Sequence, residues 1–238
     1  MKLAIIGYGK MGRMLEQLAP EYGFTVHACV DPYSKDAGDD FAQAAGADVA
    51  IEFTVPEAVA GNVEALAKLG IPVVVGTTGW LKEMDQVQAA AAQHKIGVVW
   101  SPNFSVGVNV FLRVVREAAR LLADEAEYGA WAWEIHHDTK KDAPSGTVLK
   151  LVDEMKAAGY GRPIDVSSNR AGRHPGTHEI GFDSAADTIT LRHAARSREG
   201  FARGALKAAQ WLTVGLTTGG VIGKQGVFEF SDILFTKR

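Results

Sequence analysis

The chain of 238 residues contains one cysteine, no cluster of basic residues and no long apolar run. A single cysteine, Cys29, excludes an intramolecular disulfide and a metal cluster held by several thiolates of one chain. No apolar stretch approaches the roughly 20 residues that a membrane-spanning helix requires. A net charge of −3 provides no bulk attraction for nucleic acid. We therefore expect neither a membrane nor a nucleic acid as a partner.

The start of the chain has no features of a secretory signal, because Met1 and Lys2 lead directly into the strand-like run Leu3 to Ile6. The hydrophobic content of 47% is sufficient for a substantial core. These features predict a soluble, cytoplasmic protein.

Short β-rich runs alternate with helical stretches over the first hundred residues. Residues 11–19, 56–69 and 81–94 carry apolar side chains at three-and-four spacing, the pattern of helices packed on a sheet. This alternation predicts an α/β protein with an N-terminal doubly wound parallel (Rossmann) sheet. The expected strands are Leu3 to Ile6, Thr25 to Val30, Val49 to Phe53, Val73 to Val75 and Val98 to Trp100.

The pattern changes after Asn103 and indicates a second, α+β domain built on a mixed sheet. Trp131, Trp133 and Ile135 alternate with smaller or polar residues, as on a strand with two different faces. Helices are expected at 108–122, from about 144 and at 201–212, and further strands at 178–182, 188–193 and 227–230. We assign residues 1–105 and 200–238 to the first domain and residues 106–199 to the second.

A glycine-rich motif follows the first expected strand and opens the first expected helix, which is the context that a dinucleotide-binding fingerprint requires. Asp31 ends the second strand, where a carboxylate can accept hydrogen bonds from ribose hydroxyls. Read as structure alone, Asp31 is a turn residue before Pro32. The motif comprises Gly7, Tyr8, Gly9, Lys10, Met11 and Gly12.

Two further loops lie at the carboxyl ends of the fourth and fifth strands, the edge at which open α/β sheets bind ligands. Gly, Thr and Pro also make ordinary turns, and that reading stays open for each loop. No arginine follows Asp31 to hold a 2′-phosphate, although Lys35 could reach one, so both NADH and NADPH are expected as cofactors. The loop residues are Gly76, Thr77 and Thr78, and Ser101, Pro102, Asn103 and Phe104.

Residues 134–147 hold the densest group of chemically active side chains in the sequence. His136 and His137 can transfer protons near neutral pH, and Lys140 and Lys141 attract anions. A Pro-Ser-Gly-Thr step opens an apolar-periodic helix, whose free N–H groups can hold a carboxylate. The segment predicts proton transfer to an anionic substrate.

Other readings of this segment are weaker. Adjacent histidines on a strand point to opposite faces and Lys140 would repel a cation, so we expect no metal. The histidines could be structural and the lysines solvated. A hydrolase using Ser145, His136 and Asp142 lacks the sharp turn that presents a nucleophilic serine. The loop 170–176 either contacts anions or is merely polar.

Together these motifs resemble the 4-hydroxy-tetrahydrodipicolinate reductase (dihydrodipicolinate reductase) family over nearly the whole chain. Besides the fingerprint, the resemblance is carried by Gly-Thr-Thr-Gly at 76–79, Ser-Pro-Asn-Phe-Ser-Val-Gly-Val-Asn at 101–109 and Glu-x-His-His-x-x-Lys-x-Asp-Ala-Pro-Ser-Gly-Thr at 134–147. It implies NAD(P)H-dependent reduction of a cyclic dicarboxylate in the diaminopimelate route to lysine.

The resemblance also implies residue roles. His136 matches the proton donor and Lys140 the second acid, which also contacts substrate. Lys141 stands where the family commonly has an apolar residue, so either lysine could be the one that acts. Further substrate contacts are implied at His137, Ser145, Gly146 and Thr147, and the glycine motif, Asp31 and the loops at 76–78 and 101–104 match cofactor-binding positions.

The implied mechanism transfers hydride to ring C4 of the dehydrated substrate while His136 or Lys140 protonates the adjacent carbon. Whether the enzyme also expels the 4-hydroxyl is open. Family members form homotetramers through the sheet of the second domain, to which Trp131 and Trp133 could contribute unless they serve the core. Two rivals are a small imine reductase or aspartate-type dehydrogenase and a non-catalytic NADH-sensing protein.

Overall fold

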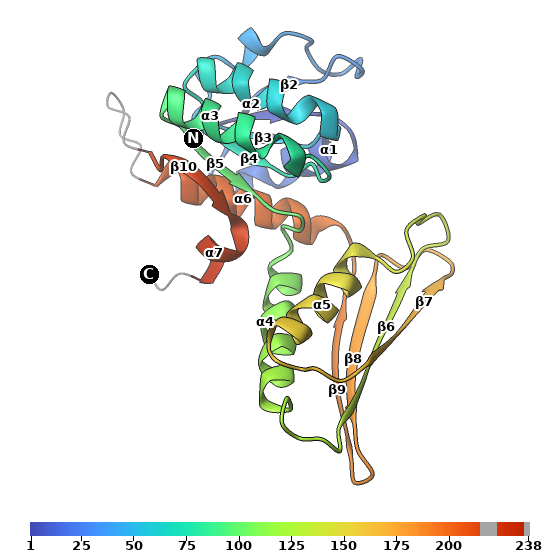
Figure 1. Cartoon of the computed structure of the whole chain (residues 1–238). Coiled ribbons are helices and arrows are strands. Elements are labelled where there is room, and N and C mark those ends of the chain that lie inside the picture. The colour runs from blue at the N-terminus through green and yellow to red at the C-terminus, as the bar shows by residue number, and fades with distance from the viewer. Residues whose placement is uncertain (215–222, 236–238) are drawn as a thin grey trace. The chain divides into compact units, whose positions relative to one another are not determined.

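The computed structural model describes residues 1–214 and 223–235, and the chain forms two compact units (Figure 1). Unit 1 comprises Met1–Ser105 and Glu199–Arg238, and unit 2 comprises Val106–Arg198. The boundaries lie within one residue of those drawn from the sequence. Within the described residues, no helix combines the length and the apolar character needed to cross a membrane.

Unit 1 is built on a parallel sheet with the strand order β10-β5-β4-β3-β1-β2. The strand order reverses at β1, which has β2 on one side and β3 on the other. In open α/β sheets, ligands bind beyond the carboxyl ends of the strands at such a point. The expected Rossmann-type sheet is confirmed. Its strands are β1 (Lys2–Ile6), β2 (Thr25–Val30), β3 (Val49–Glu52), β4 (Val73–Val75), β5 (Gly97–Trp100) and β10 (Gly226–Glu229).

Helices pack on this sheet because its central strands, β1, β3, β4 and β5, are apolar on both faces. Side chains of Ile6, Ala50 and Val73 share a core with α2 and α3, while α6 contacts β3, β4 and β5. Burial on both faces explains why these strands read as continuous apolar runs. The helices are α1 (Lys10–Leu18), α2 (Val59–Lys68), α3 (Met84–His94), α6 (Glu199–Thr213) and α7 (Phe230–Phe235), with short 3₁₀ helices at Ala19–Tyr22, Phe41–Ala44, Pro56–Ala58 and Leu81–Glu83.

Unit 2 contains a mixed sheet in the order β7-β6-β8-β9, as the sequence predicted. β6 pairs with β7 in parallel and with β8 antiparallel, and β8 pairs antiparallel with β9. Ala132 and Ile180 share a core with α4 and α5, which cover one face of the sheet. The elements are α4 (Val106–Leu121), β6 (Gly129–His136), α5 (Gly146–Ala157), β7 (Ile164–Arg170), β8 (Thr177–Asp183) and β9 (Thr188–Ala194).

The strand β7 was missed from the sequence. Ile164–Arg170 reads Ile-Asp-Val-Ser-Ser-Asn-Arg, which has few apolar residues, although Gly- and Pro-containing turns flank it at 159–163 and 172–176. Its strand conformation depends on pairing with β6, in a register that sets Glu134 opposite Ser168 and His136 opposite Arg170. This pairing brings polar side chains of two distant segments together.

Candidate active site

The glycine motif joins β1 to α1, as predicted. Gly7 has a φ of 88°, and a Cβ there would lie 2.1 Å from the Phe53 carbonyl oxygen. A Cβ at Gly12 would lie 2.3 Å from the Gly7 carbonyl oxygen, so both positions require glycine. A Cβ at Gly9 would meet nothing within 4 Å. The loop therefore offers an open approach to the N-terminus of α1, where backbone N–H groups favour a phosphate.

A groove of about 480 Å³ runs beside this loop. The structure brings the glycine motif and the 76–78 loop together here, as expected of two cofactor-binding segments. Phe53, Thr54 and Pro56 also line the groove and were missed, although their position just after β3 was a usable signal. The lining residues are Gly9, Lys10, Met11, Phe53, Thr54, Pro56, Gly76, Thr77 and Thr78.

A buried carboxylate links the two loops that line this groove, those after β3 and β4. Glu52 is completely buried, and its Oε1 accepts hydrogen bonds from Thr77 Oγ1 at 3.0 Å, Thr54 N at 3.1 Å and Asn62 Nδ2 at 3.3 Å. Burial raises the pKa of Glu52, and these donors oppose the shift. Thr54 N also donates to Thr77 Oγ1 at 2.7 Å, so the loops after β3 and β4 are tied directly.

Asp31 lies at the end of β2 beside the glycine loop. Its Oδ2 accepts a hydrogen bond from Tyr8 N at 2.8 Å, and its Oδ1 accepts one from Tyr33 N at 2.9 Å. Each oxygen keeps a lone pair for a ribose hydroxyl. Arg13, which the sequence reasoning missed, lies 4.7 Å from the centre of the Tyr8 ring and forms an ion pair with Asp36 at 2.6 Å.

The loop after β5 is tightly built. Ser101 Oγ donates to the Asn103 carbonyl oxygen at 2.8 Å and accepts from Asn103 N at 3.1 Å. Phe104 is buried in unit 1, where its ring packs against that of Phe230 with centroids 4.9 Å apart and an angle of 43° between the ring planes. A cofactor could therefore contact the backbone of Phe104 but not its side chain.

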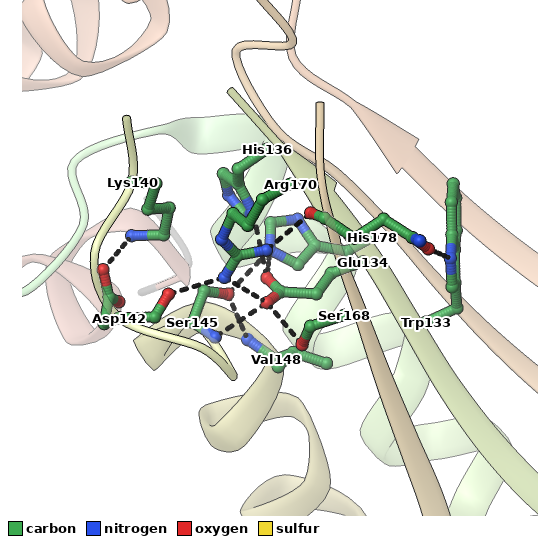
Figure 2. Close-up of polar contacts among 11 residues, drawn as sticks. Trp133, Glu134, His136, Lys140, Asp142, Ser145, Val148, Ser168, Arg170 and His178 are labelled. Carbon is green, nitrogen blue, oxygen red and sulfur yellow. Dashed lines mark hydrogen bonds and ion pairs between the residues drawn. The ribbon is translucent and has the colours of Figure 1, made fainter. Parts of the chain in front are cut away.

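Unit 2 contains the second group of predicted site residues, on β6 and in the loop that follows it (Figure 2). Glu134 and His136 are two positions apart and thus share the face of β6 that carries Ala132. His136 Nδ1 lies 3.0 Å from Glu134 Oε2, and 10% of the His136 side chain is accessible. The imidazole of His178, from β8, meets that of His136 edge to face with centroids 5.1 Å apart.

Glu134 is the centre of this cluster and is completely buried. Its Oε1 accepts three hydrogen bonds of 2.8 Å, from Ser145 N, Ser168 Oγ and Arg170 Nη2. Burial alone would raise the pKa of Glu134. The bonds from Ser145, Arg170 and Ser168 outweigh burial and hold that pKa at about 2, so the carboxylate is ionised at neutral pH.

The two imidazoles are neutral at rest near neutral pH. Burial lowers the pKa of His136, Glu134 and Asp142 draw it upward, and Lys140 and Arg170 push it down further. Burial lowers the pKa of His178 to about 4, and the neighbouring His136 acts in the same direction. A dianionic ligand near His136 would raise its pKa and favour its charged form.

The two candidate lysines differ in their surroundings. Lys140 Nζ donates to Asp142 Oδ1 at 2.7 Å, and 23% of the Lys140 side chain is accessible. Lys141 is exposed. His137 Nδ1 lies 2.8 Å from Thr139 Oγ1, outside the buried cluster. The geometry therefore favours Lys140 as the cation that acts beside His136.

The start of α5 is anchored to the same cluster. Ser145 is the N-cap residue, and its Oγ accepts from Val148 N at 3.3 Å. Its own N–H donates to Glu134. The Asp142 carboxylate lies at the same helix start, because its pKa is lowered by the hydrogen bond from Lys140 and also by the Gly146 N–H. A bound carboxylate would therefore take the place of Asp142 there. The serine-hydrolase alternative is contradicted, because Ser145 Oγ faces His178 Nε2 at 3.3 Å and Asp142 pairs with Lys140.

The cluster also contains residue types that commonly coordinate metal ions. Donor atoms of Glu134, His136 and His178 lie within 4.8 Å of one another. Arg170 already bonds to the same carboxylate at 2.8 Å, and its fixed positive charge opposes a cation. The surroundings favour holding a proton over holding a metal ion.

Several members of the cluster were missed as site residues from the sequence. Glu134 could have been found, because it precedes His136 by two positions on an alternating strand. Ser168 and His178 come from other strands and left no local signal. Arg170 was weighed only as a loop cation. The adjacent loop Ala171, Gly172, Arg173, His174 and Pro175 lines a shallow depression of about 380 Å³.

The chain is similar to known proteins along its whole length. Residues 1–104 match the family model "Dihydrodipicolinate reductase, N-terminus", and residues 107–234 match "Dihydrodipicolinate reductase, C-terminus". A relative from Thiobacillus denitrificans named 4-hydroxy-tetrahydrodipicolinate reductase is 39% identical, with 100% of this chain and 99% of that protein covered. One of the same name from Christiangramia forsetii is 33% identical, with 98% of each covered.

This chain belongs to the dihydrodipicolinate reductase family. The expectation from the sequence motifs is confirmed, and with it an oxidoreductase that uses NADH or NADPH. The fold agrees as well. A structure of dipicolinate-bound dihydrodipicolinate reductase from Paenisporosarcina sp. TG-14 superposes with a TM-score of 0.78 at 21% identity, over 98% of this chain and 99% of that one.

The fold alone does not distinguish this family from other dehydrogenases. Aspartate dehydrogenase from Thermotoga maritima shares the fold with a TM-score of 0.51 at 12% identity, over 92% of this chain and 99% of that one. The whole-length match to the reductase family makes the distinction.

Proposed function

We propose that this protein reduces 4-hydroxy-tetrahydrodipicolinate to tetrahydrodipicolinate and water with NADH or NADPH, in the diaminopimelate route to lysine in the cytoplasm. One observation carries the proposal. A chain of this reductase family places a partly accessible imidazole, a cation and the N-terminus of a helix within the segment 134–147. An imidazole next to a site for two negative charges suits protonation of a dicarboxylate during its reduction.

The residues of unit 1 fit a nicotinamide dinucleotide. The open backbone at Gly9 and the N-terminus of α1 would hold the pyrophosphate, and Asp31 would accept the ribose hydroxyls. When bound, the reduced nicotinamide supplies the hydride. The loops at 76–78 and 101–104 would form the walls around it, with Thr77 kept in place by Glu52.

In unit 2, Lys140 would take part in both substrate binding and protonation, and the other groups in one of the two. The N–H groups of Gly146 and Thr147, with His137 and Lys140, would bind the carboxylates. His136 supplies the proton to the carbon next to the reduced centre, with Lys140 as the second acid. Binding of a dianion would raise the pKa of His136, so the acid would be charged when the substrate is in place.

A direct assay tests this function and its two rivals. Purified protein is mixed with NADH or NADPH and freshly generated 4-hydroxy-tetrahydrodipicolinate, and the nicotinamide absorbance is followed. We expect substrate-dependent oxidation of the cofactor. Oxidation with oxaloacetate and ammonia instead would support the aspartate-type dehydrogenase. Cofactor binding without oxidation in either mixture would support the NADH-sensing protein.

Replacing Lys140 with alanine should raise the KM for the substrate by about 10-fold or more. A hydrogen bond from a charged donor contributes roughly 1.5 to 3 kcal/mol, which corresponds to this range. Lys141→Ala is the matched control, because Lys141 is exposed, and its steady-state constants should be within about twofold of wild type. The opposite pattern would transfer the role to Lys141.

Replacing Asp31 with asparagine should weaken NADH binding by about 10-fold, because a charged acceptor for the ribose hydroxyls is lost. NADPH binding should weaken less, since the same change removes repulsion of the 2′-phosphate. Dissociation constants from nicotinamide fluorescence decide this. Asp85→Asn on α3 is an exposed control. Equal losses for the two cofactors would refute the role of Asp31 in cofactor choice.

We also propose that the protein assembles as a homotetramer through the face of the unit 2 sheet opposite α4 and α5. Trp131, Trp133 and Ile135 are half-buried on this face, and the Trp131 ring packs on Gly181. Light scattering after size-exclusion chromatography should give four times the mass of the chain. Trp133→Glu should lower this mass, and an unchanged tetramer would place the interface elsewhere.

A further inference from the structure

Glu134 has no role in the proposed chemistry, yet it contacts two of its parts, His136 and the start of α5. Its Oε1 accepts from Ser145 N, Ser168 Oγ and Arg170 Nη2, all at 2.8 Å (Figure 2). These three donors use the accepting capacity of that oxygen. Oε2 is left for the imidazoles and lies 3.0 Å from His136 Nδ1 and 3.6 Å from His178 Nε2.

The buried polar atoms determine where the proton on His136 must sit. Glu134 Oε2 and His136 Nδ1 are both buried, and neither forms a hydrogen bond within the described residues, although the two atoms lie only 3.0 Å apart. Buried polar atoms require partners, and a carboxylate can only accept. The two atoms can satisfy each other only if Nδ1 carries a hydrogen and the ring turns to direct it at Oε2. The Nδ1–H tautomer leaves Nε2 as the nitrogen that gains and loses the proton.

The position of Gly176 agrees with Nε2 as the working nitrogen. A Cβ added at Gly176 would lie 2.9 Å from His136 Nε2. Glycine at this position therefore keeps a side chain away from the nitrogen that is left for proton transfer. His178 supports the arrangement from the other side, with Nε2 between Glu134 Oε2 and Ser145 Oγ at 3.6 and 3.3 Å.

We propose that Glu134 is a positioning residue for the proposed reduction: its carboxylate holds His136 as the Nδ1–H tautomer, so that Nε2 carries the transferred proton, and it anchors Ser145 at the start of α5. One buried group thereby sets the distance between the proton donor and the anion-binding helix start. The expected changes in kcat and in its pH profile rest on the proposed function, whereas the tautomer of His136 and the anchoring of Ser145 do not.

Glu134 also acts on the charge state of His136. The charged or titratable groups around this imidazole are Glu134 on β6, Arg170 on β7, His178 on β8, and Lys140 and Asp142 in the loop after β6. Without Glu134, the cations outnumber Asp142 and disfavour the imidazolium. Activity that needs protonated His136 falls as the pH rises through its pKa, so loss of Glu134 should move this decline to lower pH.

The decisive variant is Glu134→Gln. Three donors face the site of Oε1, so the amide oxygen must take that place and the amide NH₂ must face His136 Nδ1. Nδ1 then becomes an acceptor and the proton moves to Nε2 in the neutral ring. In ¹⁵N-histidine-labelled protein, long-range ¹H–¹⁵N spectra without ligands should show the Nδ1–H tautomer of His136 in wild type and the Nε2–H tautomer in Glu134→Gln.

The kinetic prediction separates positioning from folding. In Glu134→Gln, kcat should fall by about 10²-fold or more, the lower part of the range of general acid catalysis. The KM for the substrate should change by less than about threefold, because the amide oxygen still accepts from Ser145 N and keeps the helix start in place. The decline of kcat at high pH should begin at lower pH than in wild type.

Two variants complete the test. Glu154→Gln changes a carboxylate on α5 that pairs with Arg116 and Lys150, and it should leave the tautomer, kcat and pH profile unchanged. Glu134→Asp keeps the negative charge, and it should retain the Nδ1–H tautomer and at least about a tenth of kcat. If Glu134→Gln does not fold, as judged by circular dichroism, Glu134→Asp decides the question.

The outcomes distinguish this inference from the proposed function. A wild-type protein without reductase activity but with the tautomer switch would refute the function and support the positioning by Glu134. An active wild-type enzyme with His136 as Nε2–H would overturn the positioning. A folded Glu134→Gln variant with wild-type kcat and pH profile, or a Glu134→Asp variant that loses the Nδ1–H tautomer, would also overturn it.

Discussion

Replacing His136 with glutamine is expected to lower kcat by about 10²- to 10⁴-fold, the range that general acid catalysis typically contributes. Glutamine has a similar length and can hydrogen-bond, but it cannot carry the proton. The substrate KM should change little, because the carboxylate-binding groups lie on the loop and at the start of α5. Steady-state rates with saturating NADH measure both constants.

Two other histidines provide the comparison. His137→Gln should raise KM more than it lowers kcat, because His137 lies outside the buried cluster and is proposed to contact substrate. His27→Gln, on the exposed part of β2, should have no effect. A kcat of His136→Gln within about threefold of wild type would remove His136 from the reaction and leave Lys140 as the acid.

The second large effect is a loss of stability in acid. The pKa of His178 is lowered from 6.5 to about 4 by burial in the folded protein. Below pH 6.5 the unfolded chain therefore binds a proton that the folded chain does not, and unfolding becomes more favourable as the pH falls toward 4. This single group should lower the free energy of unfolding by about 3 kcal/mol across that interval.

Two neighbours of His178 also contribute to the pH dependence of stability. The lowered pKa of His136 adds to the loss in the same interval. The lowered pKa of Glu134 contributes stability that is present above its unfolded pKa of about 4.5 and is lost mainly as the pH falls from there toward 2. Most of the Glu134 contribution is therefore lost at lower pH than that of His178.

Urea denaturation followed by circular dichroism at pH 7.5, 6, 5 and 4 measures the effect. His178→Gln should flatten the dependence of stability on pH between 6.5 and 4, because the titrating group is gone while a donor toward Ser145 remains. His27→Gln should keep the wild-type dependence. An unchanged slope in His178→Gln would show that other groups cause the acid lability.

Much of unit 1 could be predicted because its signals are local. Four of the five strands of the first hundred residues, β1, β3, β4 and β5, are almost completely buried, and such strands are short apolar runs between turns and amphipathic helices. The first and last residues of the motif, Gly7 and Gly12, must be glycine, because a Cβ at either position would collide with a backbone carbonyl oxygen. Local sequence therefore indicated both the fold and the nucleotide loop.

The site in unit 2 was predicted only in part. His136, Lys140 and the start of α5 lie within one continuous segment, and their residue types indicate proton transfer and anion binding. Glu134 belongs to the same segment, but its importance comes from Ser168, Arg170 and His178. Those residues reach it through the pairing of β6 with β7 and β8, which no local pattern specifies.

The sequence by itself determined the alternation of strands and helices, the glycine loop between β1 and α1 and the chemical character of residues 134–147, because each depends on side chains close together in the chain. Only the tertiary structure decided that polar Ile164–Arg170 is a strand and that one carboxylate joins His136 to the helix start at Ser145. Strand register and burial arise from contacts between distant residues, and they determine which polar atoms must satisfy one another.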